Sequence, residues 1–100
     1  MSGNLLQERV AIVTGGASGI GQAVCAALAR EGAITAVLDM DGDAAKTVAT
    51  SIGGLAVTLD VSDPRACAGA VHSVTKSLGP PTILVCSAAY FAKRVPLADL

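Results

Sequence analysis

A glycine-rich stretch at residues 14–21 has the residue types and the spacing of an anion-binding turn. It reads Thr-Gly-Gly-Ala-Ser-Gly-Ile-Gly, follows the apolar run 10–13 and precedes an alanine-rich pattern of helical spacing. Backbone N–H groups at such a helix start can face an anionic ligand. Glycine permits the sharp turn, the close approach of phosphate oxygens to the backbone and the tight packing of helix on strand. The stretch therefore predicts a site for a phosphate-bearing ligand.

Two better-known glycine motifs fit these residues poorly. The phosphate loop of nucleoside triphosphatases requires Lys and then Ser or Thr after its last glycine, where this sequence has Gln22 and Ala23. The G-x-G-x-x-G dinucleotide motif would place its third glycine or alanine at Val24. The spacing present is T-G-x-x-x-G-x-G, directly after the first apolar run.

In this spacing the sequence resembles the short-chain dehydrogenase/reductase family, and the resemblance extends from Gln7 to Leu97. It implies an oxidoreductase that transfers a hydride between the nicotinamide of NAD or NADP and an alcohol or carbonyl substrate. This chain would supply the dinucleotide-binding half. The resemblance also implies which residues of the turn contact the cofactor, namely Gly15, Ala17, Ser18, Gly19, Ile20 and Gly21.

Asp39 ends the second predicted strand, eighteen residues after Gly21. A carboxylate at this position can accept hydrogen bonds from the ribose hydroxyls of NAD, and it would repel the 2′-phosphate of NADP. No Lys or Arg occurs in residues 16–18 or at Met40, which we include in the predicted site. We therefore expect NAD in preference to NADP. The alternative interpretation is a solvated or helix-capping Asp39 in the following loop.

Asp60 and Val61 end the third predicted strand. In the family that the sequence resembles, such an Asp accepts a hydrogen bond from the exocyclic amine of adenine, and the next backbone N–H donates to a ring nitrogen. The same dipeptide is compatible with a turn before the helix start at Ser62-Asp63-Pro64. Both interpretations stay open at this point.

The residues after the fourth predicted strand depart from the family pattern. Where the family has Asn-Asn-Ala-Gly, the chain has Cys86, Ser87, Ala88 and Ala89, of which Ala88 alone matches. Without the amide at Cys86 we expect fewer hydrogen bonds between this strand end and its neighbours. A methyl group at Ala89 intrudes where glycine lets the ribose come close. Ser87, Ala88 and Ala89 stay in the predicted site, with weaker cofactor binding or a rearranged loop as the expectation.

We predict no catalytic residue among these 100 residues. Catalysis in the family belongs to a Tyr-x-x-x-Lys pair with a Ser and an upstream Asn, in which the tyrosinate acts as general acid or base. The single tyrosine, Tyr90, is followed four residues later by Arg94 and lies too soon after the fourth strand. His72 is expected to be exposed on a helix.

Apolar runs alternate with helical patterns along the chain, which is typical of a parallel sheet with crossover helices. Strands are expected at 9–14, 34–39, 55–59 and 82–86. Right-handed crossovers give the strand order 3-2-1-4 and bring the predicted site residues to one edge of the sheet. We therefore predict an α/β fold: a single Rossmann-type domain over residues 1–100, as the N-terminal part of a larger doubly wound domain.

Composition narrows the expected partners and location. The chain is 52% hydrophobic with a net charge of −1, and it has no basic cluster for nucleic acid or an anionic membrane. No secretory signal or membrane-spanning run is visible. Cys25, Cys67 and Cys86 lack metal or disulfide spacing, so we expect reduced core thiols and a cytoplasmic protein.

Two alternatives to a catalytic protein remain. The 100 residues could be a complete product that binds a dinucleotide or another protein without chemistry of its own, or the protein could be a pseudoenzyme of the same fold. For a full-length enzyme we expect a small-molecule substrate and a homo-oligomer.

Overall fold

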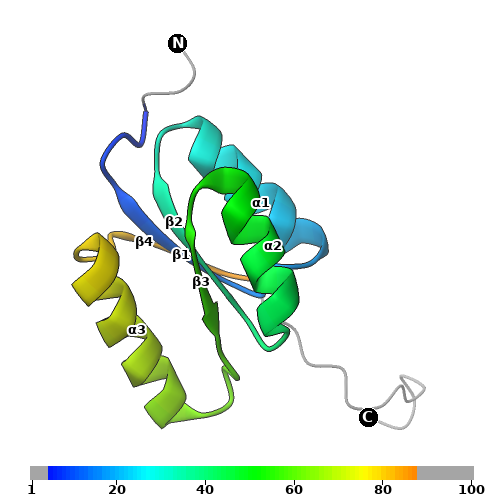
Figure 1. Cartoon of the computed structure of the whole chain (residues 1–100). Helices are drawn as coiled ribbons and strands as arrows, with labels where there is room; N and C mark the ends of the chain where they lie inside the picture. The colour runs from blue at the N-terminus through cyan, green and yellow to red at the C-terminus, as the bar shows by residue number, and fades with distance from the viewer. Residues whose placement is uncertain (1–4, 88–100) are drawn as a thin grey trace, which may run out of the picture.

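The computed structural model describes residues 5–87, in which strands and helices alternate strictly. The elements are β1 (Val10–Thr14), α1 (Gly19–Arg30), β2 (Ile34–Asp39), α2 (Gly42–Ile52), β3 (Leu55–Thr58), α3 (Pro64–Leu78) and β4 (Ile83–Cys86). The strands form one parallel sheet in the order β3-β2-β1-β4. Helices α1 and α2 cover one face, and α3 covers the other (Figure 1). The predicted Rossmann-type topology is confirmed.

β1 lies between β2 and β4, with Ile12 opposite Ala36 on one side and Leu84 on the other. Because helices also cover both faces, Val10–Val13 are no more than 4% exposed. A strand enclosed in this way is encoded by a continuous apolar run, without alternation of polar and apolar residues. The run before the glycine-rich turn is therefore the centre of the sheet.

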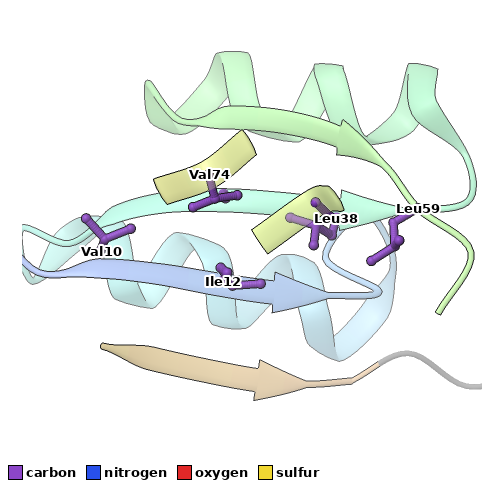
Figure 2. Close-up of a cluster of buried hydrophobic side chains, with 7 residues drawn as sticks. Val10, Ile12, Leu38, Leu59 and Val74 are labelled. Atoms are coloured by element: carbon purple, nitrogen blue, oxygen red, sulfur yellow. The ribbon is translucent and has the colours of Figure 1, made fainter. Parts of the chain in front are cut away.

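Alternate side chains of the strands build two hydrophobic clusters, one on each face of the sheet. The cluster beneath α3 is shown in Figure 2, and its labelled members are Val10, Ile12, Leu38, Leu59 and Val74. The cluster beneath α1 and α2 is built from Val13, Cys25, Val37, Ala45, Val48 and Ala49. Both cores are aliphatic, and together they hold the carboxyl ends of β1 and β2 in place.

β4 is the outer strand on its side of the described sheet, and one of its faces is open. Leu84 is 66% exposed, and Cys86 is exposed as well. The cluster beneath α3 draws on β1 and β2 and contains no residue of β4. The prediction of three core thiols is therefore wrong for Cys86, and Cys67 is only half-buried. Cys25 alone is a fully buried thiol.

Candidate functional site

Hydrogen bonds to β2 hold the turn between β1 and α1. The N–H groups of Gly15 and Gly16 donate to the carbonyl oxygen of Leu38 at 2.7 and 3.3 Å. Gly15 has a φ of +67°, a conformation that glycine adopts at no steric cost, and this lets the chain leave the strand sharply. The N–H of Ala17 donates to Oδ2 of Asp39 at 3.1 Å. The amides of residues 15–17 are thus committed to the fold.

The first turn of α1 differs from the starts of the two other described helices. Asp41 caps α2 by accepting from the N–H of Ala44, and Asp63 caps α3 in the same way. The side chain of Ser18, at the equivalent position before α1, accepts no capping hydrogen bond. The first amides of a helix have no partner within the helix, and they carry the positive end of its dipole. The start of α1 is therefore the helix start suited to an external anion.

The exposure of this turn agrees with that chemistry. Ser18, Gly19 and Ile20 are exposed, and the Ile20 side chain is 78% accessible. The first bond that closes back along α1 runs from the N–H of Gln22 to the carbonyl oxygen of Ser18, at 3.3 Å. The amides of residues 19–21 precede that bond, so they are the donors available to a phosphate group.

Close packing explains two of the glycines. A Cβ at Gly16 would lie 2.9 Å from Cγ1 of Val37 and 3.1 Å from Sγ of Cys25. A Cβ at Gly21 would overlap the carbonyl oxygen of Gly15, and it would lie 2.6 Å from Oγ of Ser87. Only glycine at these positions lets α1 approach the sheet so closely, as the sequence predicted for this turn.

Asp39 lies at the carboxyl end of β2 and is held at both carboxylate oxygens. Oδ1 accepts a hydrogen bond from the N–H of Asp41 at 3.0 Å, and Oδ2 accepts the one from Ala17. Asp39 is therefore not the cap of α2, because Asp41 fills that position. A carboxylate oxygen can accept more than one hydrogen bond, so Asp39 retains acceptor capacity toward a ligand.

Asp60 lies in the turn between β3 and α3 and is exposed. Its Oδ1 accepts hydrogen bonds from the hydroxyl and the N–H of Ser62, at 2.7 and 2.9 Å. The Ser62 hydroxyl, followed by the Ser62 N–H, lowers the pKa of the Asp60 carboxyl below its ordinary value. Asp60 thus has the turn geometry that one interpretation predicted, and its Oδ2 takes no part in these bonds. Met40 and Val61, 64% and 44% exposed, are apolar side chains that follow β2 and β3.

Ser87 joins the end of β4 to the end of β1. Its N–H and its hydroxyl both donate to the carbonyl oxygen of Thr14, at 3.1 and 2.6 Å, and the hydroxyl lies 3.4 Å from the carbonyl oxygen of Gly15. Sequence reasoning expected a loss of hydrogen bonds here and missed the role of Ser87. The signal was a hydroxyl residue at the position of the family's second Asn. Ala88, Ala89 and Tyr90 lie outside the described residues.

A groove of about 460 Å³ lies between α2 and β3, and no predicted site residue lines it. Among residues 5–87, no helix has both the length and the apolar character to cross a membrane. The same part of the chain has no group of three or more His, Cys, Asp or Glu able to hold a metal ion. His72 is exposed on α3, as predicted. The candidate site is the edge of the parallel sheet where all four strands end, from Asp60 after β3 to Ser87 after β4.

Several proteins of known activity are similar to this chain in sequence. An NAD(+)-dependent 2-dehydro-3-deoxy-L-rhamnonate dehydrogenase of Sphingomonas is 43% identical over 89% of the chain, which covers 36% of that protein. A D-threitol dehydrogenase of Mycolicibacterium smegmatis is 36% identical over 95% of the chain, which covers 38% of that protein. The chain therefore spans little more than a third of the length of these relatives.

A solved structure extends the likeness to three dimensions. A crystal structure described as ribose-5-phosphate isomerase from Brucella melitensis matches 95% of this chain with a TM-score of 0.86 and 35% identity, and the match covers 37% of that structure's chain. The sequence model of the family described as short chain dehydrogenase matches residues 9–100. With its parallel sheet in the order β3-β2-β1-β4 and its glycine-rich turn, this chain belongs to the short-chain dehydrogenase/reductase family.

Proposed function

We propose that this chain is the dinucleotide-binding half of an NAD-dependent oxidoreductase that acts on an alcohol or carbonyl substrate. One observation carries the proposal: the helix start that no side chain caps, at α1, lies beside a carboxylate at the end of the neighbouring strand, Asp39. The first feature suits the diphosphate of a dinucleotide, and the second suits the hydroxyls of its ribose.

Each part of the dinucleotide is assigned to residues that follow the carboxyl end of one strand. The amides of residues 19–21, with the exposed Ser18 beside them, bind the diphosphate, while Gly15 and Ala17 shape the turn that presents them. Asp39 accepts from the adenosine ribose. Met40, Asp60 and Val61 contact the adenine, and the accessible apolar surface of Met40 and Val61 suits a flat ring. Ser87, Ala88 and Ala89, at and after the end of β4, complete the proposed cofactor site.

NAD is favoured over NADP on grounds of charge. Asp39 is a carboxylate, and no Lys or Arg stands in residues 16–18 or at Met40 to compensate the extra phosphate of NADP. The name of the Sphingomonas relative specifies NAD(+), which supports the same choice. When bound, the nicotinamide ring would supply the hydride acceptor or donor, and residues of this chain would orient it.

The catalytic tyrosine and lysine are proposed to lie in parts of the protein beyond these 100 residues, since the chain spans little more than a third of two relatives. The small-molecule substrate, the homo-oligomer and the cytoplasmic location belong to the same proposal for the whole protein.

Titration of the full chain with NADH, followed by nicotinamide fluorescence, tests the proposal. We expect saturable binding below about 1 mM NADH, and weaker binding of NADPH. Asp43→Ala is the control for the loss of a negative charge away from Asp39, because it removes an exposed carboxylate from the first turn of α2. It should leave the affinities for NADH and NADPH unchanged. No saturable signal at millimolar cofactor, or a preference for NADPH, would contradict the proposal.

A further inference from the structure

The hydroxyl of Ser87 lies at the meeting point of β1, β4 and the glycine-rich turn. It donates to the carbonyl oxygen of Thr14 at 2.6 Å and lies 3.4 Å from that of Gly15. The same hydroxyl oxygen is 2.6 Å from the position that a Cβ at Gly21 would occupy. One side chain from the end of β4 thus contacts both the start of the turn and the first turn of α1.

The Gly15 peptide is held from both sides. Its N–H donates to the carbonyl oxygen of Leu38 in β2, and its carbonyl oxygen lies near the Ser87 hydroxyl. That carbonyl oxygen also lies so close to Gly21 that a Cβ there would overlap it. The orientation of the Gly15 peptide therefore sets how closely the first turn of α1 can approach the sheet.

Loss of the hydroxyl would act on the anion site in two ways. The carbonyl oxygen of Thr14 would keep only the N–H of Ser87, and the half-buried carbonyl oxygen of Gly15 would lose the Ser87 hydroxyl, which is unfavourable. The carbonyl oxygen of Gly15, which is partially negative, would also face the start of α1 without the donor that now offsets its charge. The uncompensated charge weakens the attraction of this helix start for an anion, and the lost hydrogen bonds free the Gly15 peptide that sets the position of the helix start.

We propose that Ser87 is a positioning residue for the diphosphate: its hydroxyl fixes the Gly15 peptide and, through it, the first turn of α1. This inference rests on the proposed dinucleotide function. Ser87 should therefore affect the binding of the diphosphate at the start of α1, and not the binding of the nicotinamide half of the cofactor.

The test compares Ser87→Ala and Ser87→Thr with a matched control in the full chain. Ser51 is the control, because its hydroxyl also donates to a carbonyl oxygen, that of Val48 at 2.7 Å, but in α2. The probes are NADH and ADP, which both carry a diphosphate, while only NADH carries nicotinamide. Urea unfolding of each variant gives the folded fraction by which the affinities are corrected.

Ser87→Ala should weaken NADH and ADP by the same factor, about three- to tenfold, which corresponds to the loss of one hydrogen bond. Ser87→Thr keeps a hydroxyl and should restore both affinities, and Ser51→Ala should change neither. A loss for NADH with ADP unchanged would overturn the inference, because Ser87 would then contact the nicotinamide half directly. Equal binding by Ser87→Ala and the wild type would overturn it as well.

A measurement without ligand separates this inference from the proposed function. The amide ¹⁵N resonances of Gly15 and Gly21 should shift in Ser87→Ala and return toward their wild-type positions in Ser87→Thr. If the wild type bound neither probe, the proposed function would fail, while these resonances would still decide whether Ser87 positions the turn. Unshifted resonances in Ser87→Ala would overturn the positioning role.

Discussion

The backbone N–H of Ala17 donates a hydrogen bond to Oδ2 of Asp39 across the edge of the sheet, at 3.1 Å. The carboxylate proposed to accept from the ribose is therefore also a fixed point for the glycine-rich turn. Since the N–H of Asp41 holds Oδ1, the carboxylate is fixed in one orientation before any ligand arrives. A substitution of Asp39 acts on two parts of the site at once.

Asp39→Ala should weaken NADH binding by about tenfold or more, because it removes an ionised acceptor of charge-assisted hydrogen bonds. It should also reduce the discrimination against NADPH, since the charge that repels the 2′-phosphate is lost. Asp39→Asn keeps one oxygen for the N–H of Ala17 but loses the acceptor of the Asp41 N–H, so it should lose discrimination and retain more of the NADH affinity than Asp39→Ala. Fluorescence titration with both cofactors measures these effects. Unchanged discrimination in both variants would remove Asp39 from the ribose.

Gly21→Ala should destabilise the chain by about 1 to 3 kcal/mol, because the added methyl group overlaps the Gly15 carbonyl oxygen. Gly69→Ala is the matched control in α3: nothing lies within 4 Å of its added Cβ. There, alanine should stabilise the helix by about 0.5 to 1 kcal/mol. The free energy of unfolding in urea distinguishes the two variants. Effects of the same sign and size would contradict the packing described at the start of α1.

Ser62→Ala should raise the pKa of the Asp60 carboxyl toward its ordinary value, because the variant removes the hydroxyl that contributes most to lowering it. Because the pKa of the Asp60 carboxyl is lower in the folded chain than in the unfolded chain, its ionised form stabilises the fold at pH values above the pKa of the unfolded chain. This stabilisation is lost as the pH falls through the pKa of the folded chain. The stability difference between wild type and Ser62→Ala should therefore shrink in acid. An NMR titration of the Asp60 side chain measures the pKa, and an unchanged value would contradict the hydrogen bond.

The thiols should react with iodoacetamide in the order of their exposure, with Cys86 first and Cys25 last. Cys25 is fully buried, and burial raises the pKa of its thiol, so it has less of the reactive thiolate at neutral pH. Mass spectrometry of peptides from the folded chain gives the rate at each site. Cys86→Ser should remove the fast phase and leave the slow one. Labelling of Cys25 as fast as Cys86 in the folded chain would contradict the described core.

The strand order, and with it the sheet edge at which the predicted site residues gather, could be predicted because both depend on local patterns. The apolar run before the turn, the T-G-x-x-x-G-x-G spacing and the handedness of the crossovers suffice to bring Gly15 and Asp39 to one edge. The exposure of Cys86 was predicted wrongly, since an apolar strand does not reveal whether a helix covers each of its faces. The bonds of Ser87 to Thr14 were missed, because they join residues 73 positions apart.

Backbone amide resonances, followed during a titration with NAD, report whether the diphosphate binds at the start of α1. We expect saturable shifts that are largest at residues 18–21 and smaller at the Asp-capped starts of α2 and α3. Shifts centred on the groove between α2 and β3, or no saturable shift at millimolar NAD, would contradict binding at the start of α1.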